Sequence, residues 1–179
     1  ELERMAPWVE WVTMPVELGD PPETGATFEA NALQKARYVF EQTGCWALAD
    51  DSGIAVDALD GRPGVFSKRY SPEATDQANN RLLLAELAGA ATRRARYHCV
   101  IALVGEAGAF THGATCEGEL GFEARGNGGF GYDPLFWPDE APKRTMAELS
   151  PAEKDQISHR GRAMQALPTL LEQAGFRRD

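Results

Sequence analysis

Apolar residues follow helical spacing in several parts of the chain. They recur three and four positions apart from Phe28 to Thr43, which predicts a helix that ends before a glycine. A second helix is predicted from Thr75 to Leu87, and another from His159 to Gln173. The segment Ser150–Glu153 matches a capping box with proline at the first helical position, so a further helix start is expected there.

Shorter apolar runs predict strands. The clearest strand runs from Tyr97 to Val104, and a hairpin turn leads from it into a strand over Ala109–Cys116. Another strand is expected at Gly118–Ala124. A buried strand is expected at Trp46–Ala49; Asp50–Gly53 interrupts it, and it continues at Ile54–Val56. The segment Glu1–Val12 is expected to form a short helix followed by a strand. Helices mixed with paired strands predict an α/β fold around a mixed sheet.

Composition narrows the class of protein. The 179 residues are 43% hydrophobic and 25% charged, which is typical of a globular protein, and the length suits one domain. A net charge of −9 argues against a protein that binds duplex DNA through a broad basic surface, but a small anionic ligand remains compatible with it. The longest apolar run, Cys99–Val104, is too short to span a bilayer. We therefore expect a cytoplasmic protein with reduced thiols and without a nucleic-acid or membrane partner.

Two adjacent carboxylates, Asp50 and Asp51, follow the apolar run Trp46–Ala49. Their side chains would point to opposite faces of a regular strand, whereas a bend at a strand end would turn both into one cleft. Carboxylates held close together recruit a cation, and oxygen ligands of this kind suit Mg²⁺. The alternative is an ordinary acidic turn, because Asp, Ser and Gly all form turns.

A lysine on the first predicted helix is a candidate phosphate ligand. Asn31 and Lys35 lie four residues apart and therefore share one helical face. The ammonium group of Lys35 could bind phosphate as a point charge, or it could simply be solvated. Glu23 lies in the preceding loop and could complete a carboxylate cluster.

Two later segments add groups that suit a nucleotide base. In the loop Gly126–Pro134, four glycines allow close backbone approach, and Phe130 and Tyr132 offer aromatic faces; the alternative is a flexible loop or a bulge. The segment that follows residue 153 concentrates basic side chains, which could hold phosphate or read a base edge, or could be an ordinary helix start: Lys154, His159, Arg160 and Arg162. Together with the carboxylates and the helix lysine, these groups are what a Mg²⁺–nucleotide site needs.

In these segments the chain resembles the inosine triphosphate pyrophosphatase family, whose members include dITP/XTP pyrophosphatases. The matching segments run through nearly the whole sequence in order. They are Thr27–Ala32 with Lys35, Ala49–Gly53, Pro63–Ser67 with Arg69 and Tyr70, Ala74–Asp76 with Asn79, Gly128–Pro134, and Ile157–Gly161.

The resemblance implies an elongated mixed β-sheet with flanking helices, in two lobes around a nucleotide cleft. It also implies a Mg²⁺-dependent enzyme and a homodimer. Such an enzyme hydrolyses non-standard purine nucleoside triphosphates (ITP, dITP and XTP) to the monophosphate and pyrophosphate, which cleanses the nucleotide pool.

The resemblance also implies roles for individual residues. Asp51 would be the catalytic carboxylate and lie near the metal, with Glu23 and Asp50 supporting the metal site. Lys35 and Ser52 would meet the phosphates. The remaining substrate-binding residues would hold the base, with Phe130 stacking on it, and contact the neighbouring phosphate region: Phe130, Gly131, Tyr132, Asp133, Lys154, His159 and Arg160.

One departure from the family pattern concerns the start of the sequence. The family opens with a strand and a Thr/Ser-Gly-Asn…Lys phosphate-binding loop just before the helix that matches Glu1–Arg4. We therefore expect one pyrophosphatase domain over residues 1–179 that lacks this strand and loop in the given sequence. Two alternatives stay open: a pyrophosphatase for another modified nucleotide, and a nucleotide-binding module without catalysis. The retained pair of Asp50 and Asp51 speaks against the second.

Overall fold

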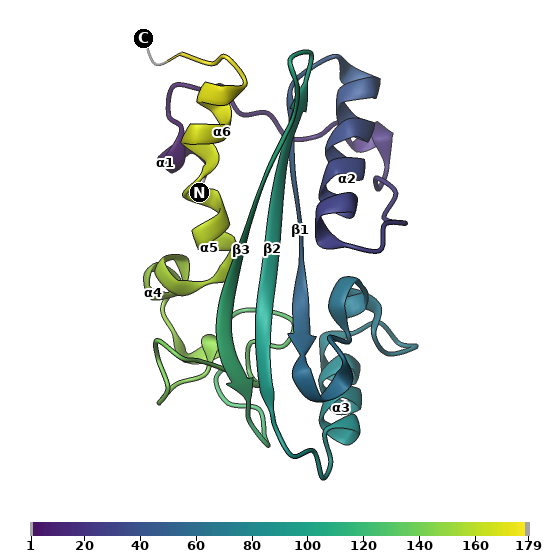
Figure 1. Ribbon diagram of the computed structural model, residues 1–179, viewed down its shortest axis with the longest axis vertical. Coiled ribbons are helices and arrows are strands. Elements are labelled where there is room, and N and C mark those ends of the chain that lie inside the picture. Colours follow the sequence, from purple (N-terminus) through teal and green to yellow (C-terminus); the bar gives the residue numbers. More distant parts are fainter. Residues whose placement is uncertain (1, 178–179) are drawn as a thin grey trace. The chain divides into compact units, whose positions relative to one another are not determined.

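The computed structural model describes residues 2–177 and contains a four-stranded antiparallel sheet in the order β1-β2-β3-β4. Figure 1 shows the three long strands β1, β2 and β3. At one edge β3 pairs with β4 in antiparallel fashion, with Leu120 opposite Phe136. The strands are β1 (Ala47–Val56), β2 (Arg94–Gly105), β3 (Gly108–Leu120) and β4 (Phe136–Pro138). The helices are α1 (Leu2–Met5), α2 (Phe28–Thr43), α3 (Asp76–Glu86), α4 (Pro151–Ile157), α5 (His159–Met164) and α6 (Leu167–Gln173). The predicted α/β class is confirmed, whereas the sheet of the described residues is antiparallel and not mixed as expected.

Helix α2 has the bounds that the apolar spacing predicted. The Thr27 side chain accepts a hydrogen bond from the Ala30 N–H at 3.1 Å, which satisfies one of the free donors of the first turn. Gly44 ends the helix in the left-handed conformation, with φ of 69°, which glycine adopts without strain. The capping box at Ser150 and Glu153 is also confirmed.

The structure corrects several of the predicted strand and helix boundaries. Asp50–Gly53 does not interrupt the first strand, because the residues continue β1 beside β2 despite their turn propensity. The two strands predicted over 109–124 are one strand, β3, that ends at Leu120, and no strand follows α1 among residues 6–15. The last predicted helix is broken between α5 and α6, and the short strand β4 follows the glycine-rich loop Gly126–Pro134.

The chain forms two compact units, each assembled from separate segments. Unit 1 comprises residues 1–51, 99–114 and 162–179, and unit 2 comprises residues 52–98 and 115–161. Strands β1, β2 and β3 each contribute residues to both units.

In the described part of the chain, 2–177, every helix is too short or too polar to cross a bilayer. One pyrophosphatase domain over 1–179 remains a prediction.

Within unit 1, the strand residues of β2 pack in two directions. Ala102 and Val104 join a core cluster with Ala32 and Ala36 of α2. The β2 residues that alternate with these, Cys99, Ile101 and Leu103, join a second cluster with residues of α5 and α6. Leu167 and Leu171 of α6 belong to this cluster. This alternation follows from the period of two along a strand, and it anchors α2 against the sheet by its alanine face.

Unit 2 has its own core and a polar strand face. Buried residues of all four strands and of α3 form one cluster, including Ile54, Leu83, Tyr97, Leu120 and Phe136. On β2, Arg94 and Arg96 alternate with the buried residues and form ion pairs with Asp139 and Glu117 at 2.7 and 3.0 Å. Leu83 of α3 and its C-cap residue Leu87 are buried in this cluster, and the partly buried Leu84 packs against it.

The N-cap of α2 offers a test of how this helix is held. Replacing Thr27 by Ala removes the acceptor for the Ala30 N–H, so the free energy of unfolding should fall by about 1 kcal/mol. Replacing Thr27 by Ser keeps a hydroxyl at this position and should retain most of the stability. Denaturant midpoints of the three proteins measure the difference, and equal midpoints for the Ala variant and the native protein would contradict this account of the cap.

Candidate functional site

A lysine held between two carboxylates forms the first cluster of the site, and it lies wholly within unit 1. The Lys35 Nζ donates hydrogen bonds to Glu23 Oε1 and to Asp51 Oδ1, each at 2.8 Å. The side chains of Lys35 and Asp51 are 15% and 12% exposed, and that of Glu23 is 31% exposed. The structure therefore brings together three residues that the sequence placed in a loop, in a helix and in the segment Asp50–Gly53.

Three elements position this cluster. Helix α2 carries Asn31 and Lys35 one turn apart, the loop before it carries Glu23, and β1 carries Asp51. Asn31 is fully buried; its Nδ2 donates to Asp51 Oδ2 at 3.1 Å, and its Oδ1 accepts from the Gly25 N–H at 2.7 Å. Both oxygens of the Asp51 carboxylate thus accept a hydrogen bond from α2.

The carboxylates keep the lysine charged. Burial lowers the pKa of the Lys35 ammonium, but the hydrogen bonds and charges of Asp51 and Glu23 outweigh this effect and raise the pKa above its ordinary value. Lys35 therefore carries its positive charge at neutral pH, between two groups that accept hydrogen bonds or bind metal ions. An arrangement of this kind can bind phosphate oxygens and orient a water molecule.

Asp50 does not join this cluster. Because β1 is continuous, Asp50 and Asp51 alternate across the strand, and the Cys99 Sγ donates to Asp50 Oδ2 at 3.8 Å. Over residues 2–177, the structure shows no group of three or more His, Cys, Asp or Glu side chains placed to hold a metal ion. Glu23 and Asp51 still fit Mg²⁺, which is commonly held by one or two carboxylates together with phosphate oxygens and waters.

A buried carboxylate organises the second cluster, which lies in unit 2. Asp133 is 2% exposed and accepts three hydrogen bonds. Its Oδ2 accepts from Lys154 Nζ at 2.5 Å and from the Phe130 N–H at 2.9 Å, and its Oδ1 accepts from the Tyr97 hydroxyl at 3.2 Å. Asp133 therefore ties the glycine-rich loop to α4 and to β2.

The glycine-rich loop is fixed by these contacts. A Cβ at Gly129, where φ is 73°, would come within 2.1 Å of Asp133 Oδ2, so the close approach of the loop requires glycine. The Gly131 N–H donates to Asp76 Oδ2 at 2.7 Å, and its carbonyl accepts from Asn80 Nδ2 at 2.9 Å. Helix α3 thus holds the loop by both backbone groups of Gly131.

Phe130 presents an aromatic ring beside two cations. The ring is 56% exposed, and its centroid lies 4.6 Å from Lys154 Nζ and 5.6 Å from Arg160 Cζ. Arg160 Nη2 also donates to Ser52 Oγ at 3.2 Å. Ser52, Phe130, Lys154 and Arg160 are therefore neighbours, as the site prediction requires. An exposed ring backed by cations is suited to stacking with a flat base.

Tyr132 does not offer the aromatic face that the sequence suggested. Its side chain is 3% exposed in the unit 2 core, and its hydroxyl donates to the Ser67 carbonyl at 2.9 Å. Burial raises the pKa of this hydroxyl. The expected stacking surface at Tyr132 is therefore wrong, because a tyrosine with a hydrogen-bond partner is more stable inside the core than in the loop surface.

His159 is buried beside a tyrosine that the sequence analysis did not identify. The imidazole is 4% exposed and stacks on the Tyr97 ring, with centroids 4.5 Å apart and an interplanar angle of 6°. Burial, with Arg160 and Lys154 close by, lowers the pKa of His159 to about 3, so the ring is neutral at pH 7. Within the described chain, its Nδ1 atom is buried without a hydrogen-bond partner.

Two supporting residues were absent from the predicted site. Asn31 was recognisable only as a neighbour of Lys35 on the helix, and its contact with Asp51 spans twenty positions of sequence. Tyr97 was visible only as a strand residue. Its inward position follows from the alternation along β2, but its contacts with Asp133 and His159 depend on long-range packing.

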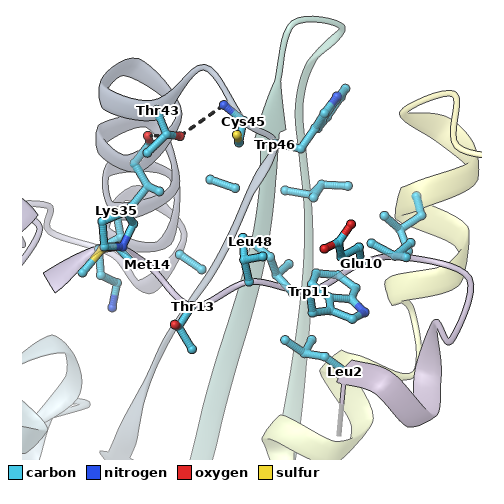
Figure 2. A pocket seen from close by; sticks show the side chains of 18 of the residues that line it. Leu2, Glu10, Trp11, Thr13, Met14, Lys35, Thr43, Cys45, Trp46 and Leu48 are labelled. Carbon is cyan, nitrogen blue, oxygen red and sulfur yellow. Dashed lines mark hydrogen bonds between the residues drawn. The ribbon is translucent and has the colours of Figure 1, made fainter.

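Unit 1 also contains a mainly apolar pocket of about 750 Å³ (Figure 2). Its walls come from residues 9–15, from α2, from the start of β1 and from the C-terminal segment. Trp11, Met14 and Leu48 line it, and Lys35 is shared with the carboxylate cluster. The apolar walls do not suit phosphate, and the sequence did not predict this pocket.

Comparisons with known proteins extend over most of the chain. A model of the Ham1 family matches residues 1–170. A dITP/XTP pyrophosphatase of Mycolicibacterium paratuberculosis is 51% identical over 156 residues, which cover 86% of this chain and 76% of that protein. Another, from Thermosynechococcus vestitus, is 47% identical over 166 residues, which cover 91% of this chain and 84% of that protein.

Known structures are similar as well. The Staphylococcus aureus Ham1 protein matches with a TM-score of 0.89 and 36% identity, over 97% of this chain and 92% of that one. A HAM1 protein from Coxiella burnetii matches with a TM-score of 0.86 and 42% identity, over 96% of this chain and 91% of that one. The architecture of this chain is therefore shared with proteins related to it in sequence.

The buried imidazole predicts a loss of stability in acid. The unfolded chain protonates His159 below pH 6.5, whereas the folded protein keeps it neutral down to about pH 3. As the pH falls through this window, the free energy of unfolding should drop by up to about 1.4 kcal/mol per unit because of this residue. Denaturant midpoints at pH 7, 6, 5 and 4 should therefore fall less steeply for His159→Gln than for the native protein. The exposed His112→Gln variant is the matched control, and parallel curves for all three proteins would refute the burial effect.

Proposed function

The chain belongs to the Ham1 family, and we propose that it is a nucleoside-triphosphate pyrophosphatase that acts on non-standard purine nucleotides (dITP, XTP and ITP). The resemblance found in the sequence motifs is confirmed by the family match and by relatives named dITP/XTP pyrophosphatase. The observation that carries the proposal is the Lys35 ammonium, held at 2.8 Å from both Glu23 and Asp51. A cation at this position would bind phosphate beside a carboxylate that would orient water, and this supports the proposal.

We assign the phosphate chemistry to the cluster of unit 1. Lys35 binds phosphate oxygens and stabilises the charge that develops on them. Asp51 accepts a proton from the attacking water, while its hydrogen bonds from Lys35 and Asn31 keep the carboxylate oriented. Water adds to the α-phosphorus as its bond to the α–β bridging oxygen breaks. Pyrophosphate leaves, so the products are the monophosphate and pyrophosphate.

A magnesium ion would complete this cluster. Glu23 and Asp51 would hold it together with the substrate, and when bound it would supply positive charge that offsets the triphosphate. The protein itself carries a net charge of −9, which repels a free polyanion and makes such neutralisation more important. Asp50, which lies on the other side of β1, remains a predicted metal-supporting residue.

We assign base recognition to the cluster of unit 2. Phe130 supplies a stacking surface, and Arg160 supplies donors only, which match the 6-oxo group of hypoxanthine or xanthine. His159, being neutral, has one ring nitrogen that donates and one that accepts; because its Nδ1 is buried, contact with the base edge requires the residues around this ring to move. Lys154 and Ser52 lie beside Phe130 and Arg160 and would contact the sugar and phosphate side of the substrate.

The same resemblance supports a homodimer in the cytoplasm. Cys45, Cys99 and Cys116 form no disulfide with one another, as is usual in a reducing compartment. Sedimentation velocity on the purified protein would reveal the dimer.

Replacing Asp51 by Asn tests the catalytic assignment. The change is nearly isosteric but removes the proton acceptor, so turnover of dITP should fall about 10²-fold or more while the fold is retained. Pyrophosphate release with Mg²⁺ measures the rate, and Glu29→Gln, on an exposed part of α2, is the control carboxylate. Near-native turnover by the Asn variant would remove Asp51 from the mechanism, and binding of dITP by the native protein without turnover would favour a non-catalytic nucleotide-binding module.

Base preference tests the second cluster. The 6-amino group of adenine presents hydrogens to Arg160, and a buried donor left unpaired costs about 1–3 kcal/mol. The native protein should therefore prefer dITP to dATP by roughly 10²-fold in kcat/KM, and Arg160→Ala should reduce that ratio. Equal values for both nucleotides in the native protein would refute the assignment, and a panel with pyrimidine and methylated nucleotides would reveal a different substrate.

A further inference from the structure

Asn31 is a buried amide that connects both acidic partners of Lys35. Its side chain is fully buried on the first turns of α2. One end of the amide contacts Asp51, and the other end contacts the backbone of Gly25, two residues after Glu23. A single side chain thus ties the loop that carries one carboxylate to the strand that carries the other.

The chemistry of its neighbours fixes the orientation of this amide. The Gly25 N–H can only donate, so the Asn31 oxygen must face it, at 2.7 Å. The Asn31 NH₂ group must then face Asp51 Oδ2, at 3.1 Å, where the carboxylate accepts. A flipped amide would oppose two donors at one end and two acceptors at the other, and both pairs would be buried.

The loop leaves no room for the amide to move away. A Cβ added at Gly25 would lie 2.7 Å from Ala30 Cβ and 2.8 Å from Asn31 Oδ1, so the loop lies tightly on the helix start. Beyond the loop, Thr24 is held by Gln34 on the same helix, with its N–H donating at 2.9 Å. The backbone N–H groups of Thr24 and Gly25, the two residues after Glu23, are therefore both held by side chains of α2.

We propose that Asn31 is a positioning residue of the pyrophosphatase reaction: its NH₂ group fixes the plane of the Asp51 carboxylate, and its oxygen fixes the loop that places Glu23 against Lys35. This proposal rests on the function proposed above. Lys35 alone holds one oxygen of Asp51 and leaves the carboxylate free to rotate about that contact. With Asn31 on the second oxygen, the carboxylate has one orientation, which is what a group that orients water requires.

Kinetics of Asn31→Asp test the proposal. The variant keeps an acceptor for the Gly25 N–H but replaces the donor to Asp51 by a second acceptor. We expect kcat for dITP to fall about tenfold or more, with KM changed by less than about threefold, because orientation is lost rather than substrate binding. Asn31→Ala removes the donor without adding an acidic group and should give the same split.

Asn79→Asp is the matched control. Asn79 is also buried, at 2% exposure, and its amide is also used at both ends, accepting from the Ser71 N–H and donating to the Lys68 carbonyl. It contacts no member of the Lys35 cluster in these hydrogen bonds. We expect its melting temperature to fall at least as far as that of Asn31→Asp while kcat stays within about threefold of native.

A double variant separates direct contact from general damage. In Asn31→Asp with Asp51→Asn, the amide and the carboxylate exchange places, so each again meets a complementary partner. Its melting temperature should recover toward native relative to Asn31→Asp alone, while turnover stays as low as in Asp51→Asn.

Three results would overturn the proposal. They are native kcat in both Asn31 variants, an equal loss of kcat in Asn79→Asp, and no recovery of the melting temperature in the double variant. If the native protein fails to release pyrophosphate from dITP in the same assay, the proposed function fails. The melting temperatures would still report whether Asn31 and Asp51 form a pair.

Discussion

The ion pair network of Lys35 with Glu23 and Asp51 is the constraint on which the site depends. Two carboxylates placed close together repel each other unless a cation lies between them. Here the cation comes from α2, and its contacts at 2.8 Å join the loop, the helix and β1 in unit 1. Because Lys35 and Asp51 are largely removed from water, loss of the lysine would leave two neighbouring carboxylates without a compensating cation and would destabilise the folded state. The fold of unit 1 and its proposed chemistry therefore use the same contacts.

Unit 2 also contains a carboxylate paired with a lysine, and there the pair holds a loop in place. Asp133 is more deeply buried than Asp51, and its pairing with Lys154 at 2.5 Å holds the glycine-rich loop in one conformation. The loop then presents Phe130 to solvent, beside the cations of Lys154 and Arg160. Asp51 and Ser52, which end one cluster and begin the other, are consecutive residues of β1. Strand β1 therefore contributes one residue to each of the two proposed clusters.

Local signals in the sequence were sufficient for the bounds of α2 but not for those of β1. The bounds of α2 follow from apolar spacing, the Thr27 cap and Gly44, all of which act within a few residues. The Asp50–Gly53 segment has the composition of a turn, yet it continues β1, because pairing with β2 outweighs local propensity. Predicting this outcome requires knowledge of the neighbouring strand, which is distant in sequence.

In the candidate site, too, the sequence indicated the residues with local signals but not the contacts that depend on tertiary packing. Lys35 and the carboxylates were identified from residue type, helical spacing and family resemblance, and the structure brings Glu23, Lys35 and Asp51 together. The sequence could not show that Tyr132 turns inward, because its hydroxyl bonds a carbonyl 65 positions away. The role of Asn31 was hidden for the same reason, since an asparagine on a helix face has no partner until the strand packs beside it.

A crystal structure of the protein with Mg²⁺ and α,β-imido-dITP, which resists hydrolysis, tests the central claim most directly. The account predicts triphosphate oxygens in contact with Lys35 beside the Asp51 carboxylate. It also predicts the hypoxanthine ring stacked on Phe130, with its 6-oxo group accepting from Arg160. A nucleotide whose phosphates lie away from Lys35 and Asp51, or whose base lies away from Phe130, would contradict it.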